Sequence, residues 1–266
     1  MLVRPRKGDQ TRAIQSAIDE VAQLQADDKG LRGAVLLAPG EYEILGQIRL
    51  SASGVVLRGS GMNQTTLIAA GTDRRPLIHV GGKSDRAVNS ALPISDAYVP
   101  VGATSIRVAN HAMKVGDSVL VTRPCTDEWT VTMKMDDLGG DRHGYRWNPN
   151  SRVLTWDRVV TQVEGEQVTL DAPITCALDA KYGGGTIAAY TWPTRVTNAG
   201  VENLSCVSTF DKSLPKDEDH SWMAVTVDNA RDVWVRRVTA THFVSSAVAV
   251  FGGASRVTVE ECKSFT

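Results

Sequence analysis

The sequence predicts an all-β solenoid with one α-helix near its start and a small inserted antiparallel β domain. Three observations predict this fold. A strand pattern repeats after residue 198, short strands broken by Gly, Pro and Ser precede residue 83, and the stretch between them lacks the repeat. We therefore divide the 266 residues into 1–82 (helix and first coils), 83–197 (inserted β domain) and 198–266 (further coils).

The first element is an amphipathic helix over residues 9–25. Either Asp9 or Thr11 can accept hydrogen bonds from the free amides of its first turn. Its apolar residues recur at helical spacing, which predicts one buried face. These positions are Ile14, Ala17, Ile18, Val21 and Leu24.

Short strands follow the helix, separated by turn residues. They span 34–37, 42–45, 48–50, 55–57 and 66–68. Such strands are typical of a sandwich, a barrel or a solenoid, and propensity does not choose among the three. The repeat favours the solenoid.

The repeat appears when three later segments are aligned. Residues 203–207 match 232–236 after 29 residues, and these match 256–260 after a further 24. Residues 224–227 recur as 247–250 after 23. A coil of this length cannot bury its own inward face, so successive coils must stack and share one core. Five additional residues in the first interval predict a protruding loop near 212–219.

This alignment predicts which side chains lie above one another. The expected inward columns are Leu204, Val233 and Val257; Cys206, Val235 and Val259; and Val238 with Cys262. It also places Arg236 over Glu260 and Arg237 over Glu261, at about 4.8 Å between strands. These arginines could be catalytic, but we interpret them as an exposed ion-pair ladder contributing a few tenths of a kcal/mol.

Residues 83–197 lack the repeat and predict antiparallel strands. The segments 99–108, 115–121 and 159–170 alternate in hydrophobicity, and Glu164-Gly165-Glu166 is a turn sequence. This stretch is therefore predicted to be a separate domain.

Charge and composition exclude several classes of protein. The 29 basic and 30 acidic side chains leave a net charge of −1, which gives no general attraction to nucleic acid or to an anionic membrane. No apolar run approaches the roughly 18 residues of a membrane span, and no secretory signal is visible. The four cysteines are isolated and form no metal-binding motif. Oligomeric state stays open.

Three segments resemble a known family. Residues 8–19 (GDQTRAIQSAID), 33–42 (GAVLLAPGEY) and 54–61 (GVVLRGSG) resemble the opening helix and first strands of the pectate-lyase-like superfamily. With the later coils, the resemblance covers about half of the chain. It implies a right-handed parallel β-helix whose open apolar end is covered by the helix. Because the repeat is still running at Thr266, we expect a fragment that lacks further coils.

The resemblance also sets the range of functions. The superfamily contains polysaccharide lyases, glycoside hydrolases, esterases, epimerases and non-catalytic adhesins, so the fold alone does not assign the chemistry. A polysaccharide partner is implied, as is a location outside the cell: secreted, periplasmic or on the cell surface. Ligands of this fold lie in a groove along one sheet.

Two histidines are the candidate catalytic residues. His220 precedes Ala224 by four residues and His242 precedes Ala247 by five, so both are expected on one rim of the groove. One neutral imidazole could remove the proton alpha to a uronate carboxylate, and the second could protonate the leaving oxygen. The alternative is two independent histidines bonded to backbone groups.

The loop before Ala224 also contains an acidic run. Asp217, Glu218 and Asp219 could bind Ca²⁺, which some lyases use, but successive carboxylates are typical of a solvated loop. We assign no metal and no certain cofactor here, and expect Asp219 and Trp222 to contact substrate.

A second set of candidate residues lies in the inserted domain. Aromatic rings stack on sugar rings, and basic side chains pair with uronate or sulfate groups. The predicted substrate contacts are Lys134, Arg142, His143, Tyr145 and Trp147. Trp129 and Trp156 are instead expected to fill the core of this domain, and the turn at 137–141 to overhang the groove.

The most specific hypothesis is a polysaccharide lyase that cleaves an acidic glycan by β-elimination. A glycoside hydrolase is one alternative, although Val244-Ser245-Ser246 occupies the place where related hydrolases carry Gly-Asp-Asp. The other alternative is a non-catalytic glycan-binding adhesin or tail-spike-like module.

Overall fold

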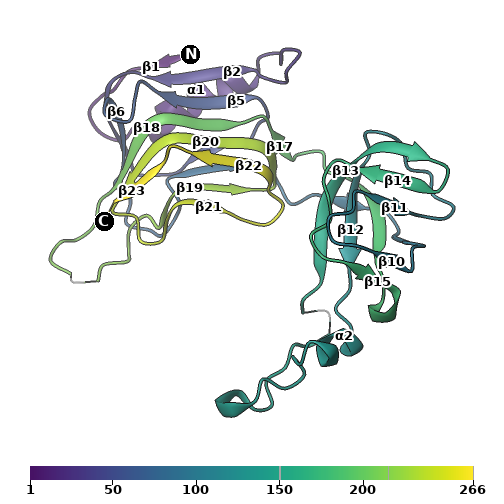
Figure 1. Ribbon diagram of the computed structural model, residues 1–266. Helices are drawn as coiled ribbons and strands as arrows, with labels where there is room; N and C mark the ends of the chain where they lie inside the picture. Colours follow the sequence, from purple (N-terminus) through teal and green to yellow (C-terminus); the bar gives the residue numbers. More distant parts are fainter. Residues whose placement is uncertain (150, 215, 266) are drawn as a thin grey trace. The chain divides into compact units, whose positions relative to one another are not determined.

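The computed structural model describes residues 1–149, 151–214 and 216–265, and the chain divides into two compact units (Figure 1). Met1–Asp85 and Thr194–Thr266 form the first, which we call the coil unit. Arg86–Pro193 form the second unit. The chain thus leaves the coil unit after residue 85 and returns to it at residue 194, whereas the sequence pattern predicts these points at 82 and 198.

The coil unit consists of parallel strands that stack in three rows, and the short strands predicted from the sequence are present. One row runs through β2, β5, β18, β20 and β22; a second through β3, β6, β18, β20 and β23; a third through β4, β7, β19 and β21. The bounds are β1 (Leu2–Val3), β2 (Gly33–Leu37), β3 (Gly40–Ile44), β4 (Ile48–Leu50), β5 (Val55–Gly59), β6 (Thr65–Ala69), β7 (Ile78–Gly81), β17 (Val196–Thr197), β18 (Gly200–Ser208), β19 (Met223–Asp228), β20 (Ala230–Thr241), β21 (Ser246–Val250), β22 (Ser255–Glu260) and β23 (Lys263–Phe265). The sheet is therefore parallel and curled, and the right-handedness of the coil stays a prediction.

The predicted N-terminal helix is α1 (Thr11–Ala22). Its buried residues Ile14, Ala17, Ile18 and Val21 belong to the same apolar core as the strands. Two details of the prediction were wrong. Leu24 lies beyond the helix and is half exposed, and the N-cap position is Gln10. Asp9 nevertheless accepts a hydrogen bond from the Thr11 amide at 3.0 Å, which satisfies one of the free amides of the first turn.

The predicted stacking is correct between the last two coils and wrong between the two before them. Val233 pairs with Val257 in the ladder, as expected. Leu204, however, pairs with Val238, and Cys206 pairs with Ala240. The true columns are Leu204 with Val238, and Val201 with Val235 and Val259. The interval between these coils is thus 34 residues, not 29.

The error has a structural cause at the corners of the coil. Three successive coils each turn twice within five residues, each time at a residue with positive φ. The first corner is formed by Asn198, Asp232 and Arg256 (φ 53°, 56° and 51°), and the second by Asn203, Arg237 and Glu261 (φ 57°, 52° and 52°). Asn and Asp tolerate this left-handed conformation better than other residues with a side chain. The pattern after Asn203 therefore resembles the pattern after Asp232, although the two belong to different corners.

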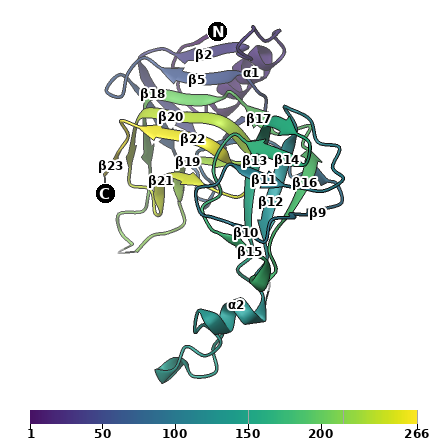
Figure 2. The same cartoon turned by 45° about the vertical axis from the view of Figure 1, so that its right-hand side comes forward.

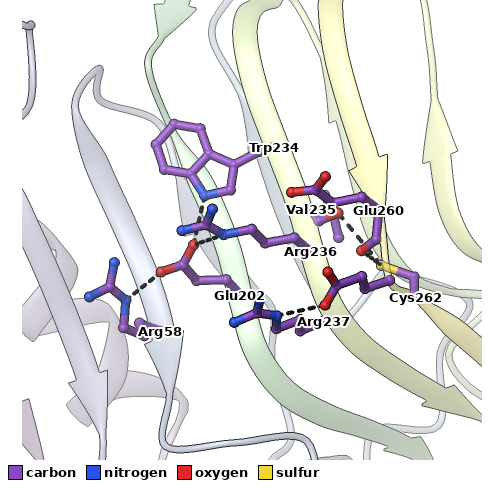
Figure 3. A network of polar contacts seen from close by, with 9 residues as sticks. Arg58, Glu202, Trp234, Val235, Arg236, Arg237, Glu260 and Cys262 are labelled. Atoms are coloured by element: carbon purple, nitrogen blue, oxygen red, sulfur yellow. Dashed lines mark hydrogen bonds and ion pairs between the residues drawn. The ribbon is translucent and has the colours of Figure 1, made fainter.

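A buried carboxylate links three neighbouring strands on the outer side of the sheet (Figure 3). The Glu202 side chain of β18 has no exposed surface. It accepts hydrogen bonds from Trp234 Nε1 at 2.9 Å and Arg236 Nε at 2.6 Å, both on β20, and from Arg58 Nε on β5. The predicted ladder is present in part. Arg237 Nε bonds Glu261 Oε2 at 2.7 Å on the surface, whereas Arg236, in register with Glu260, donates to Glu202.

The surroundings of Glu202 favour its ionised form. Burial alone would raise the pKa of Glu202, but the hydrogen bonds from Arg236, Trp234 and Arg58 outweigh it and hold the pKa below its ordinary value. Glu202 is thus a charged group whose partners come from the coils on both sides.

The second unit is built from antiparallel strands with a core of its own. Its elements are β8 (Ala87–Val88), β9 (Leu92–Pro93), β10 (Tyr98–Val99), β11 (Ser105–Arg107), β12 (Ser118–Arg123), α2 (Asp127–Thr132), β13 (Leu154–Glu164), β14 (Gln167–Leu170), β15 (Leu178–Asp179) and β16 (Thr186–Thr191). The predicted 159–170 segment is the β13–β14 hairpin, whereas 99–108 is two short strands instead of one. Trp156 is in the core, as expected, but Trp129 is half-buried and outside it. None of the described helices is long and apolar enough to span a membrane.

Gly200 provides the space for the Trp234 ring. A Cβ atom at Gly200 would lie 2.1 Å from Trp234 Cε2. We expect Gly200→Ala to lower the free energy of unfolding by about 1–3 kcal/mol, because the ring must move away from Glu202. Denaturant unfolding measures this change. Gly252→Ala is the control, since no atom lies within 4 Å of its Cβ position. Equal stability of the two variants would contradict the packing described.

Glu202→Gln should destabilise the protein in a pH-dependent way. We expect a loss of about 2 kcal/mol at pH 7, because the charge-assisted hydrogen bonds from two arginines are weakened. The folded pKa of Glu202 lies below its ordinary 4.5, so its stabilisation is present above that pH and is lost as the pH falls through the folded value. The difference between wild type and variant should therefore shrink in acid. Glu260→Gln, an exposed neighbour in the ladder, should change stability by less than about 0.5 kcal/mol at any pH.

Candidate functional site

A hollow of about 430 Å³ lies beside the loop that joins β18 to β19. We call it the histidine hollow, because both predicted histidines line it. Its lining residues are Phe210, Leu214, Lys216, Asp217, His220, His242, Phe243 and Val244. The loop after β18 supplies five of them and the corner between β20 and β21 the other three. The two loops meet because β19 and β21 are neighbours in one row, with Met223 opposite Ser246.

Phe210 lies against both imidazoles. Its ring centroid is 5.7 Å from that of His220 and 5.1 Å from that of His242. The contact with His242 is edge-on, at an interplanar angle of 64°. The two histidines are thus grouped around one aromatic ring. Sequence reasoning missed Phe210, because nothing in its local pattern distinguishes it from other loop residues.

A serine side chain forms a hydrogen bond with the His220 ring. Ser208, the last residue of β18, places its Oγ 2.8 Å from His220 Nδ1, and the imidazole is 6% exposed. The proton between them has two arrangements. If Ser208 donates to Nδ1, then Nε2 carries the proton; if Ser208 donates to the Ser221 carbonyl at 3.5 Å, Nδ1–H donates to Ser208 and Nε2 is the basic nitrogen. Either way, Ser208 fixes the orientation of the ring.

The loop that carries His220 is closed by Asp217. Its carboxylate accepts hydrogen bonds from the backbone amides of Asp211 and Asp219, at 2.8 and 2.9 Å. These two hydrogen bonds lower the pKa of Asp217. Asp217 is therefore an ionised anchor of the loop at the edge of the hollow.

Asp219 and Trp222 belong to a separate surface cluster around Arg74. Arg74 Nη2 lies 3.2 Å from Asp219 Oδ1, and its guanidinium carbon lies 5.1 Å from the Trp222 ring centroid. Trp222 Nε1 donates to the Glu218 carbonyl at 3.0 Å. Neither residue lines the hollow. The run 217–219 thus binds backbone amides and Arg74, and no group of three metal-ligating side chains is found among the described residues.

The remaining predicted contacts all lie in the second unit, on the segment that joins α2 to β13. His143 Nδ1 pairs with Asp137 Oδ2 at 2.8 Å and is largely exposed. Trp147 stacks on Trp129 at 5.6 Å and is also covered by Arg152. Lys134, Arg142 and Tyr145 are exposed. Their role in binding substrate stays a prediction.

A histidine–aspartate pair was missed by sequence reasoning. His79 of β7 places Nε2 2.8 Å from Asp228 Oδ2 of β19, and Nδ1 of the same ring is buried without a hydrogen-bond partner in the described part of the chain. The two residues are 149 positions apart. No local signal connects them, since the pairing depends on where the chain returns after the second unit.

Comparisons with known proteins give matches to solved structures alone. No family model and no curated protein matches the chain. The tailspike protein gp49 from Pseudomonas phage LKA1 has a TM-score of 0.46 and 17% identity, over 93% of this chain and 33% of its own. The Gp54 tailspike of Acinetobacter baumannii bacteriophage AP22, in complex with capsular saccharide, has 0.46 and 13%, over 97% and 33%. The tailspike gp61 of Pseudomonas phage phi297 has 0.43 and 18%, over 91% and 41%. The chain thus spans about a third to two fifths of the length of these neighbours.

Removing the Ser208 hydroxyl should release the His220 ring. We expect Ser208→Ala to cost about 1–2 kcal/mol of stability, because Nδ1 of a buried ring loses its partner. The nitrogen chemical shifts of His220 should change, and those of His242 should change less. Ser245→Ala, which removes an exposed hydroxyl on the other loop, is the control. Unchanged His220 shifts in Ser208→Ala would show that the hydrogen bond does not orient the ring.

Proposed function

We propose that the coil unit binds a polysaccharide and that the histidine hollow receives one or two of its sugar residues. The observation that carries this proposal is the grouping of His220 and His242 around Phe210 in a hollow of about 430 Å³ that also presents Lys216 and Asp217. Volumes of this size are typical of small-ligand sites, where an apolar wall is combined with a few polar groups.

The chemistry of the lining suits a sugar. Phe210 and Phe243 offer apolar surface to the C–H faces of a pyranose ring. Imidazole nitrogens exchange hydrogen bonds with hydroxyl groups as donors or acceptors. Lys216 supplies a positive charge for a carboxylate. Each oxygen of Asp217 holds one backbone amide and has a second lone pair for a sugar hydroxyl. An acidic glycan therefore fits the hollow better than a neutral one.

The proposal includes the finer features implied by the family resemblance. The coil is a right-handed parallel β-helix of the pectate-lyase-like kind, α1 covers one end of it, and residues 86–193 form an inserted domain. A glycan of polymer length is met outside the cell, so the protein is secreted, periplasmic or on the cell surface. The bounds of the inserted domain follow the division of the chain into two units, and the other features rest on the resemblance of 8–19, 33–42 and 54–61 to that superfamily.

A second candidate function is cleavage of the bound glycan by β-elimination. The specific observation in its favour is the Ser208–His220 hydrogen bond, which orients a ring that lines the hollow. In this reaction one imidazole takes the proton from the carbon alpha to the uronate carboxylate. The electron pair forms the new carbon–carbon double bond, the glycosidic oxygen leaves, and the other imidazole protonates it.

Hydrolysis is the third candidate and has less support. Glycosidases use two carboxyl groups that flank the scissile bond. Among the described residues that line the hollow, Asp217 is the one carboxylate, and both of its oxygens accept hydrogen bonds from backbone amides.

Binding is tested with a panel of acidic and neutral polysaccharides. We expect the wild-type protein to bind an acidic polymer, and His242→Ala or Phe210→Ala to weaken binding about tenfold, because each removes part of the hollow wall. Isothermal titration measures the affinity. His111→Gln, which changes a histidine of the second unit, should bind as the wild type does. Equal affinity of all variants for every polymer would place binding elsewhere.

Cleavage is tested on the same panel by ultraviolet absorbance of unsaturated uronate products. A lyase gives new absorbance that is lost in both His220→Ala and His242→Ala. Binding without absorbance or new reducing ends leaves the non-catalytic function, whereas reducing ends without absorbance identify a hydrolase.

A further inference from the structure

A second cavity lies within the second unit, and it shares no residue with the histidine hollow. Its volume is about 180 Å³. It is lined by Tyr98, Arg123, Trp129, Thr132, Met133, Cys176, Ala177, Asp179, Tyr182 and Gly184. These residues come from the end of β12, from α2 and the residue after it, from β10, and from β15 with the segments on either side of it. The labelled elements lie at the same end of this unit (Figure 1 and Figure 2).

Arg123 is the unusual member of this lining. The residue is 4% exposed, and its Nη1 is buried with no hydrogen-bond partner in the described part of the chain. Its contact is with an aromatic ring: the guanidinium carbon lies 4.0 Å from the Trp129 ring centroid. An arginine stays charged at every physiological pH, and a buried charge without a counter-ion is costly. The cation–π contact offsets part of that cost but leaves Nη1 without an acceptor in the described part of the chain.

We propose that this cavity binds the carboxylate of an acidic sugar, with Arg123 as its counter-ion. A carboxylate accepts two parallel hydrogen bonds from a guanidinium, which is the geometry that arginine recognises best. The site stands apart from the proposed function of the coil unit, because none of its residues belongs to that unit.

The other lining residues select a sugar over a simple anion. Tyr98, Trp129 and Tyr182 line the cavity with aromatic surface, on which the apolar face of a pyranose ring can pack. Asp179 would repel a bare anion but accepts hydrogen bonds from sugar hydroxyls. One of its oxygens already binds the Lys181 amide at 2.9 Å, so the other is the acceptor for a ligand.

Charge and size narrow the ligand further. Lys181 lies over the Tyr182 ring at 5.1 Å, which adds a second positive charge near the cavity. A volume of about 180 Å³ is below the roughly 300–1,000 Å³ of sites for larger small molecules, which suits one sugar residue and not an oligosaccharide. The ligand is thus a single uronate residue, such as a chain end or a side branch of a glycan.

Cys176 makes the site testable in the whole 266-residue chain. Its thiol is free, half-buried and part of the cavity lining, whereas Cys262 is a free, half-buried thiol of the coil unit. Glucuronate should slow the alkylation of Cys176 by iodoacetamide at least fivefold at saturation, and should leave Cys262 unchanged. Glucose at the same concentration should not protect. The proposal is overturned if glucose or acetate protects Cys176 as well as glucuronate does. It is also overturned if neither glucuronate nor galacturonate protects Cys176.

Two variants locate the effect. Arg123→Met keeps the side-chain volume and removes the charge, and should raise the concentration needed for protection at least tenfold. Ala177→Phe leaves Arg123 in place and fills the cavity, and should abolish protection even if Arg123→Met does not fold. Arg152→Ala, which removes a cation that lies over Trp147 and not in the cavity, should behave as the wild type.

Protection of Cys176 that survives in both Arg123→Met and Ala177→Phe would contradict the site. His220→Ala should keep full protection, so failure here and failure of the histidine hollow are distinguishable.

Discussion

The stacking of parallel strands in register is the constraint on which the rest of the coil unit depends. Each inward residue is covered by its equivalents one coil before and one coil after. Val235 is fully buried between Val201 and Val259, whereas Val259, on the last described coil, is about half exposed. Burial at one position is therefore a property of its neighbours in the stack. The loops between rows do not share this constraint, so they can carry polar and functional side chains.

The same stacking makes a buried charge tolerable on the outer side of the sheet. The Trp234 ring packs against Gly200 and donates a hydrogen bond to Glu202, and Arg58 and Arg236, on the strands on either side, neutralise the carboxylate. A slip of one residue between β18 and β20 would turn these partners to the other face. A shifted register would therefore leave the buried charge of Glu202 without its partners, which is costly. The apolar columns impose no such cost, because valines and leucines in them can replace one another.

The stacked parallel strands could be predicted from the sequence because local alternation of apolar residues carries the repeat, and this alternation is kept although the individual residues differ between coils. The spacing of Val233 and Val257 was found in this way. The pairing of Leu204 with Val238 was not, because corners five residues apart carry the same left-handed residue followed by the same alternation. The ladder between β18 and β20 distinguishes the two alignments, and it depends on contacts between strands that the local pattern does not contain.

The candidate sites could be predicted from the sequence only in part. The two histidines were found because each precedes a strand whose position in the repeat is clear, and in-register strands bring their preceding loops together. The residues that give those histidines a defined environment, Ser208 and Phe210, act through the fold of one loop. Arg123 is harder still to predict from the sequence, since the residues around it are those of an ordinary strand end. Its significance comes from what surrounds it: an aromatic ring at 4.0 Å, a cavity and no described acceptor. The spacing of residues in the sequence predicts which side chains can lie close together. The burial of each side chain in the structure then identifies polar groups, such as Arg123, that are buried without a hydrogen-bond partner in the described part of the chain.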